Sequence, residues 1–139
     1  MSSSMSRSER DWVAQGASEA DVLSRLYDVW TYKEALTKNM GLGLGYDFAR
    51  IDLRFGRDVR LAMDGRAVDT YRFRELALPC GASSHAPGSR VAVALGPCDA
   101  REAPMAKQAV PAQQAMDEGW LRMWTYDAWL EYARAMSGV

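Results

Sequence analysis

The residues that most constrain the fold lie between 51 and 63, where apolar and polar side chains alternate on both sides of a turn signal. Such alternation is typical of strands that bury one face. A two-residue loop at residues 56–57 would place Leu53 opposite Arg60, whereas a three-residue loop that includes Asp58 keeps each face uniform. The longer loop places these apolar residues opposite one another: Phe55 and Val59, Leu53 and Leu61, Ile51 and Met63. The sequence therefore predicts an antiparallel hairpin in this register.

Helices are predicted at both ends of the chain. Apolar residues recur with the helical period over about residues 19–40, and Ser18 is a suitable N-cap for that helix. The aromatic-rich segment 117–136 also has a helical pattern. Between the helices, residues 67–78 and 91–95 predict two more strands in addition to the hairpin.

The order of these elements predicts an α+β fold: an antiparallel sheet of three to five strands, with an N-terminal and a C-terminal helix packed on one face. A chain of 139 residues suits one domain. We expect residues 1–15 to form a flexible N-terminal tail and residues 16–139 to form the single α+β domain.

Composition excludes several classes of protein. With 17 Lys plus Arg against 18 Asp plus Glu, the net charge of −1 excludes a globally basic nucleic-acid-binding protein. The first residues lack the apolar core of a signal peptide, and no stretch approaches the roughly 20 apolar residues of a membrane span. We therefore expect a cytoplasmic protein with no membrane partner, in which Cys80 and Cys98 stay reduced.

Two groups of residues resemble ligand-binding motifs, one for a dinucleotide and one for zinc, but neither has the spacing or the context that such a motif requires. The Gly-rich run at residues 41–45 follows a predicted helix and is followed by Tyr46, whereas a dinucleotide loop follows a strand and opens a helix. Cys80, His85 and Cys98 lack the paired spacing of structural zinc sites, and an ordinary surface loop explains Cys80 and His85 better than a metal site or a catalytic thiol does. The sequence predicts no cofactor, no metal and no catalytic residue.

Arginine is concentrated in one segment of the chain. Residues 50–74 hold seven arginines and four aspartates, a charge of +3, which leaves −4 for the rest of the chain. In the predicted register Arg54 lies directly opposite Arg60, and like charges so placed destabilise a sheet unless an acidic neighbour or a bound anion intervenes. The segment is either a solvated sheet face or a docking face. Its candidate partner-binding residues are Arg50, Arg54, Arg57, Arg60, Arg72 and Arg74.

The C-terminal segment carries more aromatic residues than one buried helical stripe needs. An ordinary core helix is one interpretation, and an interface in a homodimer is the other, because Trp and Tyr are common interface anchors. The candidate interface residues are Trp120, Trp124, Tyr126, Trp129 and Tyr132.

These features favour a small non-catalytic cytoplasmic binding protein, of the inhibitor, immunity or accessory type. It would engage a protein partner, which an Arg-rich face suggests is acidic, through that face or through the aromatic helix. A nucleic-acid-binding protein that uses the same face is the first alternative. A small enzyme that holds an anionic substrate with Arg54 and Arg60 is the second.

Overall fold

The computed structural model describes residues 4–43, 45–78, 89–99, 109–119, 121–122 and 126–137. The chain begins with two helices, α1 (Arg7–Ala14) and α2 (Glu19–Asn39), followed by a short 3₁₀ helix at Phe48–Arg50. The strands are β1 (Ile51–Phe55), β2 (Val59–Met63), β3 (Arg66–Val68), β4 (Arg72–Leu78), β5 (Ser89–Leu95) and β6 (Ala109–Pro111). Two C-terminal helices follow, α3 (Ala112–Asp117) and α4 (Tyr126–Ser137).

The strands form two sheets, where the sequence suggested one. The first has the order β1-β2-β3 and is antiparallel throughout, and the second has the order β5-β4-β6. In the second sheet β4 pairs antiparallel with β5 and parallel with β6. The predicted strand 67–78 is divided, because β3 ends at Val68 and β4 begins at Arg72 in the other sheet.

The predicted hairpin register is confirmed in full. The structure pairs Ile51 with Met63, Leu53 with Leu61, Arg54 with Arg60 and Phe55 with Val59. Leu53 and Leu61 are buried, as the alternation requires, whereas Arg54 and Arg60 are exposed. The pattern of apolar residues therefore sets both the pairing and the face of this sheet.

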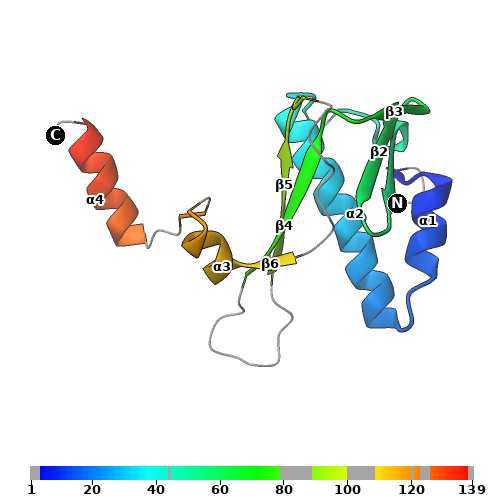
Figure 1. Ribbon diagram of the computed structural model, residues 1–139, viewed down its shortest axis with the longest axis horizontal. Coiled ribbons are helices and arrows are strands. Elements are labelled where there is room, and N and C mark those ends of the chain that lie inside the picture. The colour runs from blue at the N-terminus through cyan, green and yellow to red at the C-terminus, as the bar shows by residue number, and fades with distance from the viewer. Residues whose placement is uncertain are drawn as a thin grey trace.

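Helix α2 holds the two sheets together (Figure 1). It packs against β5 and against α1, and α1 packs along β1. Its buried residues Tyr32 and Leu36 join Ile51 and Leu53 of the first sheet and Phe73 of the second in one core. The predicted helix is confirmed with its N-cap, since the Ser18 side chain accepts a hydrogen bond from the backbone of Asp21.

Helix α1 lies in the segment that we expected to be a tail. Ser6 and Glu9 form a capping box: the backbone N–H of Ser6 donates to Glu9 Oε2 at 2.7 Å, and Ser6 Oγ accepts from the Glu9 backbone. Trp12 stacks on Phe55 with ring centroids 4.2 Å apart. The local capping box and the ring stack on a residue distant in sequence together order the segment.

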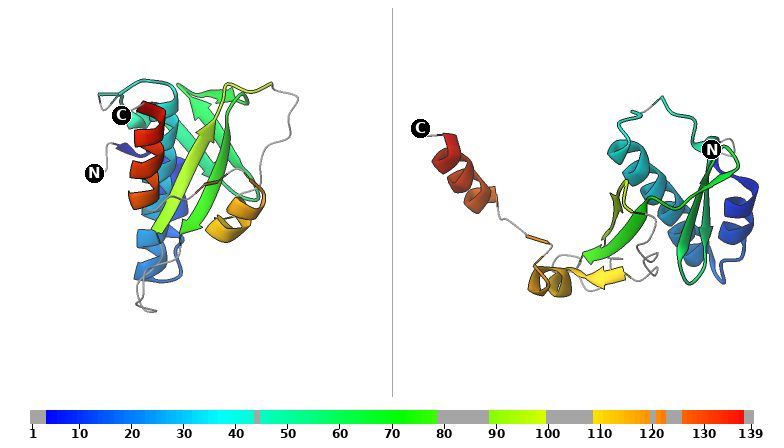
Figure 2. Two further views of the ribbon diagram at one scale, coloured as in Figure 1. Left: turned by 90° about the vertical axis from the view of Figure 1, so that its left-hand side faces the viewer. Right: turned by 45° about the horizontal axis from the view of Figure 1, so that its top comes forward.

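The α+β class is confirmed, with an antiparallel three-stranded sheet, N-terminal helices and a C-terminal helix. The C-terminal helical segment differs in detail, because it contains α3 and a separate α4. Helix α4 stands apart from both sheets (Figures 1 and 2), so it does not pack on a sheet face as expected. Among the described residues, no helix is both long and apolar enough to span a membrane.

Candidate functional site

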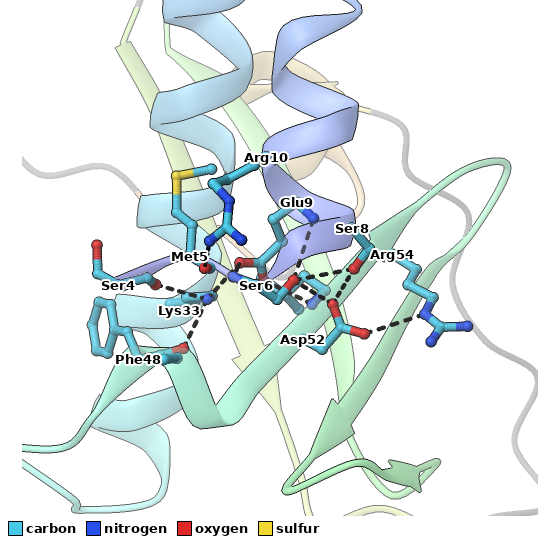
Figure 3. Close-up of polar contacts among 12 residues, drawn as sticks. Ser4, Met5, Ser6, Ser8, Glu9, Arg10, Lys33, Phe48, Asp52 and Arg54 are labelled. Carbon is cyan, nitrogen blue, oxygen red and sulfur yellow. Dashed lines mark hydrogen bonds and ion pairs between the residues drawn. The ribbon is translucent and has the colours of Figure 1, made fainter. Parts of the chain in front are cut away.

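A buried ion pair joins α1 to α2 (Figure 3). Lys33 Nζ lies 2.7 Å from Glu9 Oε2, and their side chains are 1% and 0% exposed. The same ammonium donates to the backbone carbonyls of Ser4 at 3.0 Å and of Phe48 at 2.8 Å. All three protons of Lys33 therefore have acceptors, which a buried ammonium requires.

Glu9 also binds the sheet. Its second oxygen, Oε1, accepts the backbone N–H of Leu53 at 2.8 Å. Burial lowers the pKa of Lys33, and Glu9 acts in the opposite direction through its hydrogen bond and its charge. The carboxylate thus fixes α1, α2 and β1 relative to one another, and it sets the rotation of α2 about its axis.

That rotation determines which residues α2 exposes. The exposed face carries Leu23, Tyr27 and Trp30, then Glu34 and Lys38, spaced as one stripe of a helix. Glu34 Oε2 lies 3.4 Å from Lys38 Nζ, and the side chains are 20% and 75% exposed. The stripe places a carboxylate, able to accept a proton, beside an ammonium, able to neutralise a phosphate.

A second polar network joins α2 to the other sheet. Arg90 Nη1 donates to Asp28 Oδ1 at 2.7 Å and lies 3.7 Å from Glu75 Oε1. The hydroxyl of Tyr32 donates to Glu75 Oε2 at 3.2 Å. Burial first, and then the negative charge of Glu75, raise the pKa of Tyr32, so the phenol stays protonated. Asp28 and Glu75 are both buried and share one cation, which identifies this network as a structural link.

The six arginines expected to bind a partner do not form one patch. Arg54, Arg57 and Arg60 are exposed at the β1–β2 hairpin. Arg50 makes two hydrogen bonds of 2.7 Å with the carboxylate of Asp64, and these lower the pKa of Asp64.

The remaining two arginines lie on β4, in the second sheet. Arg72 is buried and donates to the backbone carbonyls of Asp69 and Tyr71, and Arg74 is half-buried. The burial of Arg72 argues against a role in docking. The hairpin arginines remain candidates.

The aromatic candidates lie partly outside the described residues, as do Cys80 and His85. Trp120 and Trp124 are the two interface candidates that lie outside the described residues. Tyr126, Trp129 and Tyr132 lie on α4 and are exposed. Their exposure is compatible with an interface between two copies of the chain, and the homodimer stays a prediction.

Sequence reasoning missed Glu9, Lys33, Glu34 and Lys38. A signal was present, because the chain has only three lysines and two of them flank a glutamate on one predicted helix. In the parts of the chain that the structure describes, no three metal-ligating side chains lie together. The expected absence of a metal and of a cofactor therefore stays a prediction.

Comparison with known proteins changes the functional interpretation. The family model of the 4'-phosphopantetheinyl transferase superfamily matches residues 1–94, which include α1, α2 and the first four strands. A 4'-phosphopantetheinyl transferase, pptA, from Paxillus involutus is 40% identical over 67 residues. That match covers 48% of this chain and 25% of the relative, so the chain spans about a quarter of the relative's length.

These matches overturn the expectation of a non-catalytic binding protein of the inhibitor or immunity type, because both point to an enzyme. The expectation rested on the lack of a local catalytic motif, whereas the match to the family extends over residues 1–94 of this chain. Since the family model covers more than half of the chain, the protein belongs to the 4'-phosphopantetheinyl transferase superfamily.

Proposed function

We propose that this chain acts in the transfer of a 4'-phosphopantetheinyl group from coenzyme A to a hydroxyl of a carrier protein. The family match over residues 1–94 is the observation that carries the proposal. In this transfer the hydroxyl oxygen forms a new ester bond to phosphorus. The bond between that phosphorus and the nucleotide part of coenzyme A breaks, and the hydroxyl proton passes to a base.

The exposed face of α2 supports this chemistry. Lys38 is the exposed cation of the stripe and is suited to a phosphate of the donor. Glu34 is less exposed, and it lies next to Lys33, whose burial fixes the helix. We assign Glu34 the role of proton acceptor and Lys38 that of phosphate ligand.

The test is transfer by the purified full chain, followed as the increase in mass of an unmodified carrier protein incubated with coenzyme A. Glu34→Gln should lower kcat by about 10²-fold or more, because it removes the proton acceptor and keeps the shape. Lys38→Ala should raise the KM for coenzyme A. Glu131→Gln, an exposed position on α4, is the matched control and should have no effect.

Two results contradict this proposal in different ways. A wild-type chain that leaves the carrier mass unchanged contradicts the activity. Transfer by Glu34→Gln at the wild-type rate contradicts the assigned site and leaves the activity standing.

The partner and the location belong to the same proposal. Phosphopantetheinyl transferases act on carrier proteins, which agrees with the protein partner that the sequence suggested. A cytoplasmic location would place the chain with its donor, and cell fractionation tests it.

A further inference from the structure

Helix α4 stands apart from the rest of the fold (Figures 1 and 2). Among the described elements, it packs closely against no other helix or strand. It has 12 residues, and an isolated helix of that length is only marginally stable in water. Helices in proteins gain most of their stability by burying an apolar face, so α4 requires a surface that covers it.

One face of α4 is apolar and exposed. Its four large side chains recur every three or four residues: Tyr126, Trp129, Tyr132 and Met136. They are 50–73% exposed. The charged residues of the helix lie on the opposite face: Asp127, Glu131 and Arg134. This division between an apolar and a charged face is typical of a helix that packs on another surface.

The apolar face is self-complementary in an antiparallel arrangement. Trp129 and Ala133 are each two residues from Glu131, and Tyr126 and Met136 are each five residues from it. When two copies of α4 pair antiparallel about this midpoint, Trp129 faces the partner's Ala133, and Tyr126 faces the partner's Met136. A large side chain then meets a small one at the centre of the contact. Each copy uses the same surface, as a two-fold dimer requires.

The exposed area of this face fits a weak dimer. The four large side chains leave about 500 Å² exposed in each chain, if a full side chain of this size presents about 200 Å². An apolar patch of that size marks an interaction surface. Two copies would bury about 1,000 Å² in total, which is the lower limit for a specific interface.

The charges of α4 favour a second copy over a lipid surface. Amphipathic helices that bind anionic membranes carry Lys and Arg on their polar face. The polar face of α4 carries two acidic residues, Asp127 and Glu131, and one basic residue, Arg134.

We propose that the chain forms a two-fold homodimer in which α4 packs antiparallel against α4 of a second copy. The interface is independent of the proposed function, because α4 lies outside residues 1–94, which match the family. Trp129 is its central anchor, since a buried tryptophan commonly contributes most of the binding energy of such a contact.

Sedimentation velocity of the full chain measures the dimer directly. Between about 1 and 200 µM the wild type should show a monomer–dimer equilibrium with a Kd on the order of 10 µM. Ala133→Arg introduces a charge opposite Trp129 and should raise this Kd about 100-fold or more. Ala135→Arg is the matched control, because it adds the same charge to an exposed position on another side of α4. It should change the Kd by less than about twofold.

Two variants that are each monomeric test the antiparallel orientation. Trp129→Glu removes the anchor and introduces a negative charge, so it should also raise the Kd about 100-fold or more. In an equal mixture with Ala133→Arg, the introduced charges are opposite in sign and face each other only in an antiparallel pair. The mixture should therefore associate about tenfold more tightly than either variant alone.

Four results overturn the dimer proposed here. The first is a wild type that stays monomeric at about 200 µM. The second is an equal effect of Ala133→Arg and Ala135→Arg, and the third is a mixture that does not associate. The fourth is a dimer that Tyr27→Ala, at an exposed position on α2, dissociates as strongly as Ala133→Arg does, because the interface would then include α2. Since α4 does not pack on the sheets, all these variants of α4 should keep the urea unfolding midpoint of the wild type.

Discussion

The buried pair of Glu9 and Lys33 gives the sharpest test of how this fold is held together. Glu9→Gln keeps the size of the side chain and an oxygen for the Leu53 N–H. It leaves the ammonium of Lys33 with neutral acceptors only, at the carbonyls of Ser4 and Phe48. Removing one charge of a fully buried pair costs about 3–5 kcal/mol. Because a small domain has a free energy of unfolding of about 5–15 kcal/mol, most of it could be lost.

A double-mutant cycle separates the pair from its surroundings. Lys33→Met alone should lower the free energy of unfolding about as much as Glu9→Gln, since it leaves the buried Glu9 carboxylate without its cation. Glu9→Gln/Lys33→Met removes both charges and should cost only about 1–2 kcal/mol. The two substitutions should therefore be strongly non-additive.

Urea denaturation followed by tryptophan fluorescence measures these free energies of unfolding. Trp12 lies on α1 and stacks on Phe55, so it reports on the docking of that helix. If the cost of the double variant equals the sum of the two single variants, the pair is not coupled and our reasoning is wrong. The same conclusion follows if Glu9→Gln lies within about 1 kcal/mol of the wild type.

Three further predictions follow from the same structure. In Glu9→Gln the pKa of Lys33 in the folded chain should fall further below the 10.5 of the unfolded chain. Between these two pKa values the unfolded chain binds more protons than the folded chain, so unfolding experiments should show the variant gaining stability as pH rises. A pH-independent difference from the wild type would contradict this. Leu53→Ala should lower the free energy of unfolding by about 2–5 kcal/mol in urea titrations, because the side chain is fully buried, and a loss under 1 kcal/mol would contradict the core assignment. Gly96→Ala should lower Tm, because its Cβ would lie 2.6 Å from Tyr71 Cδ1 at a φ of +155°; an unchanged Tm in calorimetry would refute the clash.

The residue pairing of the hairpin could be predicted because two local signals agree. Only one loop length places Leu53 opposite Leu61, and the same loop buries both. Helix α1 could not be predicted in this way. Its order depends on Lys33 and Asp52, whose positions near Ser6 and Glu9 are fixed only by the fold.

The candidate site was harder to predict because its signal is ordinary on any helix. Glu34 and Lys38 are four residues apart, a spacing that also occurs in solvent-exposed ion pairs such as Asp21 with Arg25. What distinguishes the stripe is the buried Lys33 beside it, and burial of a lysine is not visible in the sequence. The search for short catalytic motifs therefore could not reveal the family.

The bond from Leu53 to Glu9 has a further consequence for the behaviour of the protein in concentrated solution. β1 is the edge strand of its sheet, and an edge with free N–H groups is a template for strand addition by another molecule. Glu9 occupies the N–H of Leu53 at that edge, and α1 packs along the strand. Helix α1 thus shields β1 from intermolecular pairing, and a chain in which α1 detaches would be prone to aggregate through this strand before the rest of the fold is lost.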